Sequence, residues 1–264
     1  MPNLHRRKFL QYSTQATLAT VGIPGIINAA FKHQPVKSIR LEKNSVVLFQ
    51  GDSVTDGGRE RNPTKYNSSN ADRSAEYNDF NVFGSGYAML AGTRLLFNHP
   101  KKQFKIFNRG ISGNKVHQLA ERWKEDCLDL KPSVLSILIG VNDYWHTLSH
   151  GYKGTAETYR TDLTALIERT RQALPDVQLI IGEPFALKDV QAVTNEWYPA
   201  FDEYRAIARS IANDQKAVFV PYQKVFDEAL SAAPASYWSF DGVHPSIPGN
   251  MLMANAWMKA VSVK

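Results

Sequence analysis

Residues 46–56 read Val-Val-Leu-Phe-Gln-Gly-Asp-Ser-Val-Thr-Asp, an apolar run that ends in a glycine and polar residues. An apolar run with little polar alternation is typical of a parallel strand that is covered on both faces. We therefore expect a strand over Val46–Gln50 that ends just before Ser53. The carboxyl ends of parallel strands form the ligand crevice of an α/β sheet, so the sequence predicts that Ser53 lies at the floor of a binding crevice.

Similar apolar runs recur along the 264-residue chain, and longer amphipathic stretches separate them. Strands are expected at 46–50, 104–108, 134–139, 178–181 and 217–220. Helices are expected near 86–97, 116–128, 155–173, 197–213, 223–230 and 248–261. This alternation predicts an α/β fold, a three-layer α/β/α sandwich around a five-stranded parallel sheet. We expect one domain over 46–264, preceded by a linker over 31–45.

The segment Arg59–Val82 is polar, rich in asparagine and without convincing periodicity. A long connection inside a compact domain is usually either functional or mobile. Its position directly after the first strand favours the functional interpretation.

The net charge of +6 is confined to the start of the chain. Residues 1–45 hold seven of the 31 Lys and Arg residues and only one of the 25 Asp and Glu residues, so the remainder is formally neutral. A nucleic-acid-binding protein would carry its basic surface on the folded domain. The distribution therefore excludes nucleic acid as an expected partner.

The first 30 residues have the layout of an export signal. Arg6-Arg7-Lys8-Phe9-Leu10 is followed by an uncharged stretch from Tyr12 to Ala30 with small residues at its end. The paired arginines resemble the twin-arginine export signal, which predicts a periplasmic or extracellular protein. Threonine and glycine interrupt the apolar run, so a stable membrane span is not expected. The alternative is a disordered cytosolic N-terminus in which two arginines are adjacent by chance.

Polar blocks follow several of the expected strands and recur near the C-terminus. They are Gly51-Asp52-Ser53, Gly110, Gly140-Val141-Asn142-Asp143 and Asp241-Gly242-Val243-His244-Pro245. In this order the blocks resemble the SGNH (GDSL) hydrolase superfamily, and the resemblance spans nearly all of the chain after residue 45. It implies a flavodoxin-like arrangement of the sheet. Within the superfamily, Phe49-Gln50-Gly51-Asp52-Ser53 through Arg59, Gly84-Ser85-Gly86-Tyr87 and Asn108–Asn114 are similar to bacterial acetyl-xylan and related carbohydrate esterases.

The residue types fit ester hydrolysis by a serine. A serine hydroxyl is a weak nucleophile until a base removes its proton, and His244 is the candidate base for Ser53. Asp241 can hold the imidazole in the required tautomer. The resemblance assigns the oxyanion hole to the backbone N–H groups of Ser53 and Gly110 and to the side-chain amide of Asn142. Such donors stabilise the charge of a tetrahedral intermediate.

Each of these residues also has a purely structural interpretation. Ser53 and Asn142 could cap helices, Gly110 could make a turn, and Asp241-Gly242 is a common turn dipeptide. An active site is excluded only if all of these structural interpretations are true at once. We therefore favour an active site. The chain contains no G-x-S-x-G elbow, P-loop or H-E-x-x-H motif.

No cofactor or metal is expected. The single cysteine, Cys127, excludes an internal disulfide framework and a zinc site built from several thiolates. The histidines other than His244 form no convincing set of metal ligands.

Possible substrate-binding residues are Asp52, Trp145 and Trp238, which are close in sequence to the candidate site residues. Sugar rings can stack on tryptophan, but core packing is an equally good interpretation of both tryptophans.

The sequence therefore predicts an exported serine esterase that removes acyl groups, in particular acetyl groups, from an oligosaccharide or polysaccharide. A lipid esterase, lysophospholipase or thioesterase on the same fold remains the alternative. A catalytically silent carbohydrate-binding protein is disfavoured because Ser53, Asp241 and His244 are all present. The sequence does not decide the oligomeric state.

If the N-terminal segment is an export signal, the secreted mature chain should begin near Phe31. N-terminal sequencing of exported protein measures this directly. A sequence starting at Met1 or Pro2 would contradict the prediction.

Overall fold

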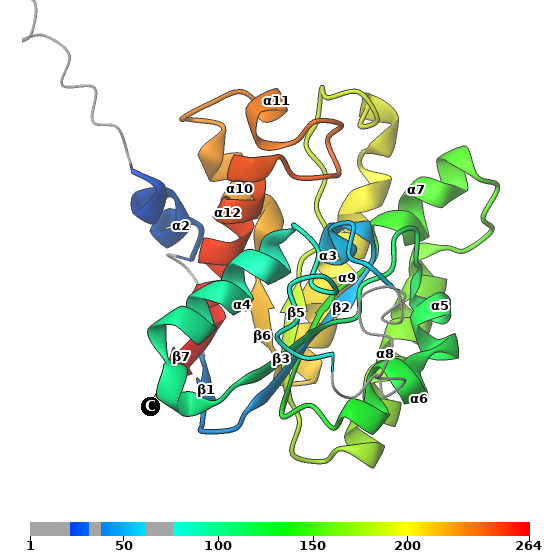
Figure 1. Cartoon of the computed structure of the whole chain (residues 1–264). Coiled ribbons are helices and arrows are strands. Elements are labelled where there is room, and N and C mark those ends of the chain that lie inside the picture. Colours follow the sequence, from blue (N-terminus) through cyan, green and yellow to red (C-terminus); the bar gives the residue numbers. More distant parts are fainter. Residues whose placement is uncertain (1–21, 32–37, 62–75) are drawn as a thin grey trace, which may run out of the picture.

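The centre of the protein is a parallel sheet of five strands in the order β3-β2-β4-β5-β6 (Figure 1). The strands are β2 (Val46–Gly51), β3 (Lys105–Asn108), β4 (Val134–Leu138), β5 (Gln178–Gly182) and β6 (Val218–Val220). The structure is a computed structural model and describes residues 22–31, 38–61 and 76–264. All five strands coincide with the expected apolar runs to within one residue at either end. The predicted α/β sandwich is thus confirmed.

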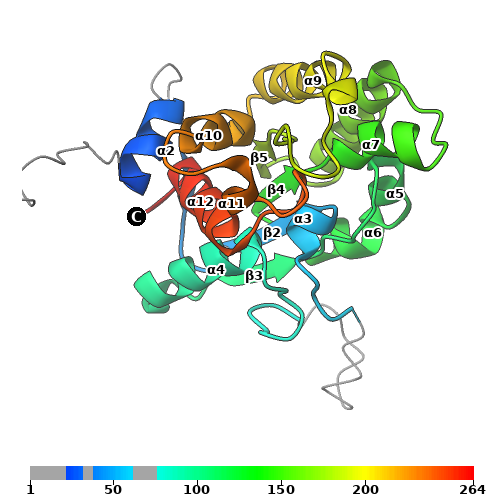
Figure 2. The ribbon, with the colours of Figure 1, turned by 90° about the horizontal axis from the view of Figure 1, so that it is seen from above.

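Helices cover both faces of this sheet (Figures 1 and 2). One face carries α4 (Tyr87–Asn98), α10 (Tyr222–Ala229) and α12 (Ile247–Trp257). The other carries α5 (Val116–Glu121), α6 (Trp123–Asp126), α8 (Ala156–Ala173) and α9 (Ala200–Asp214). Each of the five strands is almost wholly buried between these layers, which explains why the strands lack polar alternation.

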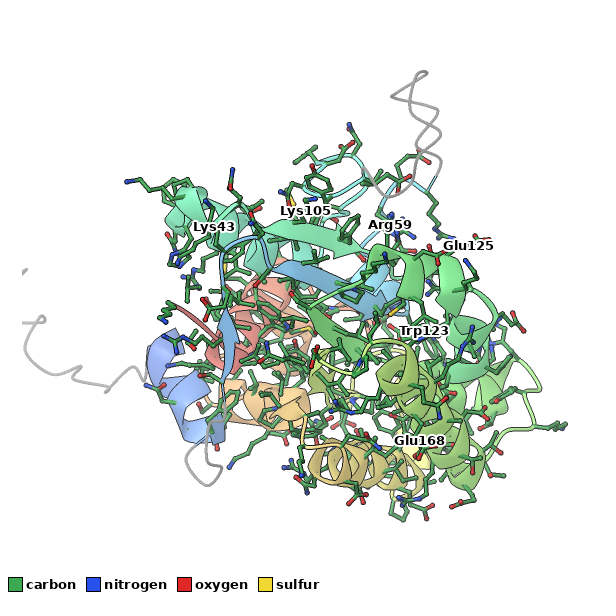
Figure 3. All side chains as sticks on the ribbon, turned by 90° about the horizontal axis from the view of Figure 1, so that it is seen from below. Lys43, Arg59, Lys105, Trp123, Glu125 and Glu168 are labelled. Carbon is green, nitrogen blue, oxygen red and sulfur yellow. The ribbon has the colours of Figure 1, made fainter. Side chains whose placement is uncertain are left out.

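Two buried tryptophans have a hydrogen-bonded indole in the core, one on each side of the sheet. Trp257 Nε1 donates to Ser136 Oγ on β4 at 3.0 Å. Trp123, labelled in Figure 3, donates from Nε1 to Thr170 Oγ1 on α8 at 2.9 Å. These bonds satisfy buried polar groups that would otherwise cost free energy.

The edge at the carboxyl ends of the strands carries short helices (Figure 2). They are α3 (Ser53–Asp56), α7 (Val141–Ser149) and α11 (Ala235–Trp238). The short 3₁₀ helices are η3 (Pro100–Lys102), η4 (Leu128–Leu130), η5 (Asn195–Trp197) and η6 (Met258–Ala260). The four-residue helices α3 and α11 were not predicted, because four residues complete about one turn and show no repeat. The nine-residue helix α7 was also not predicted.

Three expected helices differ from the structure by more than one residue. The helix expected over 248–261 is α12, which ends at Trp257 and is followed by η6 and β7 (Val261–Val263). The helix expected over 116–128 is divided at Arg122, whose side chain binds Asn114 Oδ1, the Arg109 carbonyl and Asp126. The helix expected from residue 197 begins at Ala200, directly after Pro199, because proline has no N–H for a preceding helical turn.

A second, two-stranded parallel sheet joins the two ends of the described chain. β1 (Ile39–Leu41) pairs with β7 (Val261–Val263). β1 lies in the segment expected to be a linker, so the described part of that segment is paired with the C-terminal strand. Ile39-Arg40-Leu41 and Val261-Ser262-Val263 each have an exposed polar residue in the middle, so neither is a continuous apolar run.

The polar segment 59–82 lies partly outside the described residues. Within its described part, Asn78 binds the edge of the main sheet: its side chain accepts from the Ile106 N–H at 2.9 Å and donates to the Phe104 carbonyl at 2.8 Å. The segment is therefore anchored to β3 at this point.

The paired arginines and most of the expected export signal lie outside the described residues. The described part includes α2 (Ile23–Phe31), which packs against α10 and α12 and buries Ile26 and Ile27. No helix among the described residues is long and apolar enough to cross a membrane.

Because Ile26 and Ile27 are buried, we expect each alanine substitution in the full chain to reduce the free energy of unfolding by about 2–5 kcal/mol. The exposed Asn28 provides the matched control, and Asn28→Ala should change stability by less than about 0.5 kcal/mol. Urea unfolding measures both effects. Equal midpoints for the three variants and the wild type would show that α2 does not contribute to the folded core.

Candidate active site

Ser53 follows a turn that only glycine can make. A Cβ on Gly51 would lie 2.2 Å from the Leu138 carbonyl oxygen and 2.5 Å from Thr55 Oγ1, so strand β2 can approach β4 closely only without a side chain there. The buried Asp52 then caps α3, its Oδ1 accepting from the Val54 N–H at 3.0 Å. Ser53 is consequently the first residue of α3, at the carboxyl edge of the sheet.

Ser53, His244 and Asp241 form one chain of hydrogen bonds. His244 Nε2 lies 2.8 Å from Ser53 Oγ, and His244 Nδ1 lies 2.6 Å from Asp241 Oδ2. The other carboxylate oxygen of Asp241 accepts from the N–H groups of Val243 and His244 at 2.9 and 2.7 Å. The aspartate therefore holds both the ring and the backbone of the histidine.

The turn that carries Asp241 and His244 is fixed by the residues around it. Gly242 has φ +93°, and a Cβ there would lie 2.6 Å from Val193 Cγ2 and 2.7 Å from the Leu187 carbonyl oxygen. Ser239 Oγ accepts from the Gly242 N–H and donates to the His244 carbonyl. The Asp-Gly turn and the histidine geometry are thus parts of one arrangement, and the turn interpretation does not compete with a functional one.

The contact between Asp241 and His244 stabilises the ionised aspartate and makes the histidine more basic. Partial burial raises the pKa of Asp241, but hydrogen bonds from the His244 side chain and from two backbone amides outweigh it, so that the pKa lies below its ordinary value. The hydrogen bond to Asp241 raises the pKa of His244, and the aspartate charge adds to it, against the opposing effect of burial. This is the pattern expected of an imidazole next to a carboxylate.

Gly110, in the loop after β3, and Asn142, in the first turn of α7, are the other expected oxyanion-hole residues. A Cβ on Gly110 would lie 2.4 Å from the Asp56 nitrogen, so this loop packs directly on α3. The Gly110 N–H already donates to Asn108 Oδ1 at 3.0 Å. Asn142 Nδ2 donates to the Asn114 carbonyl at 3.2 Å, which leaves its second amide hydrogen for another acceptor.

Two buried polar residues that the sequence analysis gave no role join these loops. Asp56 accepts from the Arg59 N–H through Oδ1 and from the Ser112 N–H through Oδ2. Asn108 Nδ2 donates to the carbonyls of Thr55 and Phe83, both at 2.7 Å. Arg59, labelled in Figure 3, adds a bond from Nε to the Gly110 carbonyl at 2.8 Å. Asn108 is the last residue of β3, and Asp56 ends the short helix α3 that follows β2, so the available signal was a polar residue near the carboxyl end of a strand.

A pocket of about 640 Å³, here called the Ser53 pocket, opens at this site. Its lining residues are Ser53, Val54, Asp56, Gly57, Gly58, Arg61, Ser85, Gly86, Ser112, Phe240, Asp241, His244, Pro245 and Asn250. Phe240 stacks on the His244 ring, with centroids 5.7 Å apart and planes 10° apart, and is 59% exposed. The sequence analysis missed Phe240 and Arg61, although Phe240 directly precedes Asp241.

None of the three expected substrate-binding residues is among those that line this pocket, and two of them are buried. Asp52 is the cap of α3, and burial raises its pKa to about 7. Trp238 is 2% exposed, and its Nε1 lies within hydrogen-bond distance of the carbonyls of Ala229 and Ala233. Asp52 and Trp238 therefore lie away from the pocket surface, and Trp238 is packed in the core. Trp145 is partly buried, with its ring centroid 6.3 Å from that of His244.

The described residues contain no group of three or more His, Cys, Asp or Glu side chains that could hold a metal ion. Cys127 is buried, and burial raises the pKa of its thiol. Burial and the neighbouring Lys115 lower the pKa of His146 to about 4.

Comparison with known proteins gives consistent matches over most of the chain. Residues 49–252 match the GDSL-like Lipase/Acylhydrolase family. An acetylxylan esterase of Geobacillus stearothermophilus is 29% identical over 233 residues, which cover 84% of this chain and 96% of the relative.

Solved structures agree with this. A protein of Parabacteroides merdae assigned as a GDSL-like lipase is 54% identical, with a TM-score of 0.79, over 84% of this chain and 98% of its own. Axe2, an acetylxylan esterase from Geobacillus stearothermophilus, is 29% identical with a TM-score of 0.71, over 86% and 98%. Catalytic mutants of Axe2 replace a serine, an aspartate and a histidine by alanine.

Because Asp241 raises the pKa of His244 above the ordinary 6.5, we expect more than half of the His244 rings to be protonated at pH 6.5. Asp241→Asn removes the negative charge and should lower this pKa. Titration of the His244 ring resonances by NMR measures both values. An unchanged pKa in the variant would contradict the assignment of Asp241 as the main cause.

Proposed function

Because this chain belongs to the GDSL-like lipase/acylhydrolase family and is a carboxylic ester hydrolase, we propose that it removes acetyl groups from acetylated carbohydrates through Ser53, His244 and Asp241. The observation that carries this proposal is the continuous hydrogen-bonded chain of 2.8 and 2.6 Å from Ser53 to Asp241. The spacing of Asp241 and His244 adds support, since the aspartate and histidine replaced in the catalytic mutants of Axe2 are also three positions apart.

In the proposed reaction, Ser53 Oγ attacks the ester carbonyl carbon while His244 Nε2 accepts the hydroxyl proton. Asp241 stabilises the imidazolium that forms. His244 then gives the proton to the departing sugar hydroxyl, which leaves an acyl group on Ser53. A water molecule, deprotonated by His244, hydrolyses this acyl-enzyme and restores the serine. The raised pKa of His244 suits a group that both accepts and returns a proton.

The oxyanion of the tetrahedral intermediate would be bound by the Ser53 N–H and by the second amide hydrogen of Asn142. The Gly110 N–H would have to share its hydrogen between the oxyanion and Asn108 Oδ1, because it already donates there. Gly110 contributes in a second way, since its lack of a side chain lets the loop after β3 approach α3. Such preorganised donors are worth about a hundredfold or more in rate each.

The choice of an acetylated carbohydrate rests on two observations. The relative Axe2 is described both as an acetylxylan esterase and as an acetyl-xylooligosaccharide esterase. The Ser53 pocket also contains hydrogen-bonding side chains, among them Arg61, Ser85 and Asn250, which suit a hydroxylated substrate. Hydrolysis of longer acyl esters is the second candidate, favoured by the 54% identity to a protein assigned as a GDSL-like lipase.

We also infer that the enzyme acts outside the cytoplasm after twin-arginine export. This inference rests on the sequence of residues 1–30. A polymeric substrate outside the cell would require such a location.

Ser53→Ala should lower kcat/KM for 4-nitrophenyl acetate about ten-thousandfold or more, because the nucleophile is lost. The exposed Ser231 lies outside the Ser53 pocket, and Ser231→Ala serves as the control with unchanged activity. Equal rates for Ser53→Ala and the wild type would exclude Ser53 as the nucleophile.

A substrate panel decides between the two candidate functions. We expect release of acetate from acetylated xylo-oligosaccharides to be faster than release of fatty acid from lysophospholipid, measured at equal substrate concentration. The reverse order would assign the enzyme to longer acyl esters.

A further inference from the structure

The groove at the candidate active site continues beyond Ser53. A second pocket of about 470 Å³, here called the Phe80 pocket, is lined by Gly57, Gly58, Arg59, Glu60, Arg61, Phe80, Asn81, Gly84 and Ser85. It shares Gly57, Gly58, Arg61 and Ser85 with the Ser53 pocket. The two pockets are therefore contiguous, and the Phe80 pocket adds space beyond the one that holds Ser53 and His244.

Two of the four residues that the pockets share, Gly57 and Gly58, have no side chain. Gly57 has φ +58°, and a Cβ there would lie 2.6 Å from the Gly86 nitrogen. Gly58 has φ +72°, and a Cβ there would meet no atom within 4 Å. Because neither residue has a side chain, the two pockets are open to each other over the glycine pair, and a ligand can lie across it.

The two walls of the Phe80 pocket are hydrogen-bonded to each other. Ser85 donates from both its N–H and its hydroxyl to the Gly57 carbonyl, at 2.8 and 3.0 Å. The Glu60 N–H donates to the Asn81 carbonyl at 3.1 Å. Segments on either side of residues 62–75 are thus held in a fixed relation, so the pocket is preformed in the described residues.

Arg61 stands at the junction as a hydrogen-bond donor. Its guanidinium nitrogen lies 3.0 Å from the buried Asp56 Oδ2, while half of the Arg61 side chain is exposed. Asp56 in turn holds the backbone of Ser112 and Arg59. The position of the guanidinium is therefore tied to the loops around Ser53.

Phe80 supplies an apolar surface in these polar surroundings. Its ring is 77% exposed, and an aromatic ring exposed beside polar side chains in a pocket is a typical ligand contact. A sugar ring combines an apolar C–H face with hydroxyl groups. Its C–H face suits the Phe80 ring, and its hydroxyls suit the polar groups of Arg61, Asn81 and Ser85.

We propose that the Phe80 pocket is a second sugar subsite, which binds the sugar residue next to the acetylated one by stacking on Phe80. The inference rests on the proposed acetyl esterase activity at Ser53. It identifies the substrate as an oligosaccharide of at least two sugar rings. It also gives the described end of the polar segment 59–82 a role in substrate selection.

The test compares kcat/KM for singly acetylated xylotriose with kcat/KM for 4-nitrophenyl acetate, which has no neighbouring sugar. Phe80→Ala should lower the ratio of the two values about tenfold, the size expected for loss of one aromatic contact. Phe80→Tyr keeps the ring and should leave the ratio within about twofold. Phe97 is 84% exposed on α4 and lines neither pocket, so Phe97→Ala is the matched control with an unchanged ratio.

The outcomes separate this inference from the proposed function. A ratio of the two kcat/KM values that is lowered in Phe80→Ala but not in Phe80→Tyr or Phe97→Ala supports the subsite. An equal ratio in Phe80→Ala and Phe97→Ala, with an active wild type, overturns the subsite and leaves the esterase intact. A wild type that hydrolyses 4-nitrophenyl acetate but not acetylated xylotriose overturns the subsite and the proposed carbohydrate substrate. If Phe80→Ala instead lowered kcat/KM only for 4-nitrophenyl octanoate, the pocket would bind an acyl chain, and the proposal would also be overturned.

Discussion

The hydrogen bond between Ser53 Oγ and His244 Nε2 joins residues that are 191 positions apart in the chain. It can form only where strand β2 and the turn before α12 end at the same edge of the sheet. Because β3 and β4 are the neighbours of β2, the loops after all three strands also meet there. The site therefore requires a sheet topology that brings these strand ends and the turn before α12 to one edge.

Close backbone contact at this edge depends on two features. Glycine residues leave room for the backbone, and buried polar side chains form hydrogen bonds with it. Gly51 and Gly110 allow the loops after β2 and β3 to approach β4 and α3 at distances that a Cβ would prevent. Asp56 and Asn108 then satisfy the backbone N–H and carbonyl groups of these loops. A low-dielectric interior makes such bonds strong and makes their loss costly, so the site is held in shape before substrate binds.

The sequence predicted all five strands of the main sheet because each is buried on both faces and is therefore continuously apolar. It failed for β1 and β7, whose middle residues are polar and exposed and which pair over more than 200 positions. Among the site residues, proximity in sequence was a poor guide. Trp238, three positions before Asp241, is packed in the core, whereas Phe240 stacks on His244. Which ring reaches the pocket depends on the turn at residues 239–245.

The sequence by itself determined the α/β class, the order of the polar blocks and the residue types of a serine esterase, because strand burial and nucleophile chemistry both leave local signals. It also located the net charge in the first 45 residues. Only the tertiary structure decided which side chains meet. The 2.6 and 2.8 Å contacts of His244, the roles of Asp56 and Asn108, and the groove from Ser53 to Phe80 all join distant segments, whose distances no local pattern encodes.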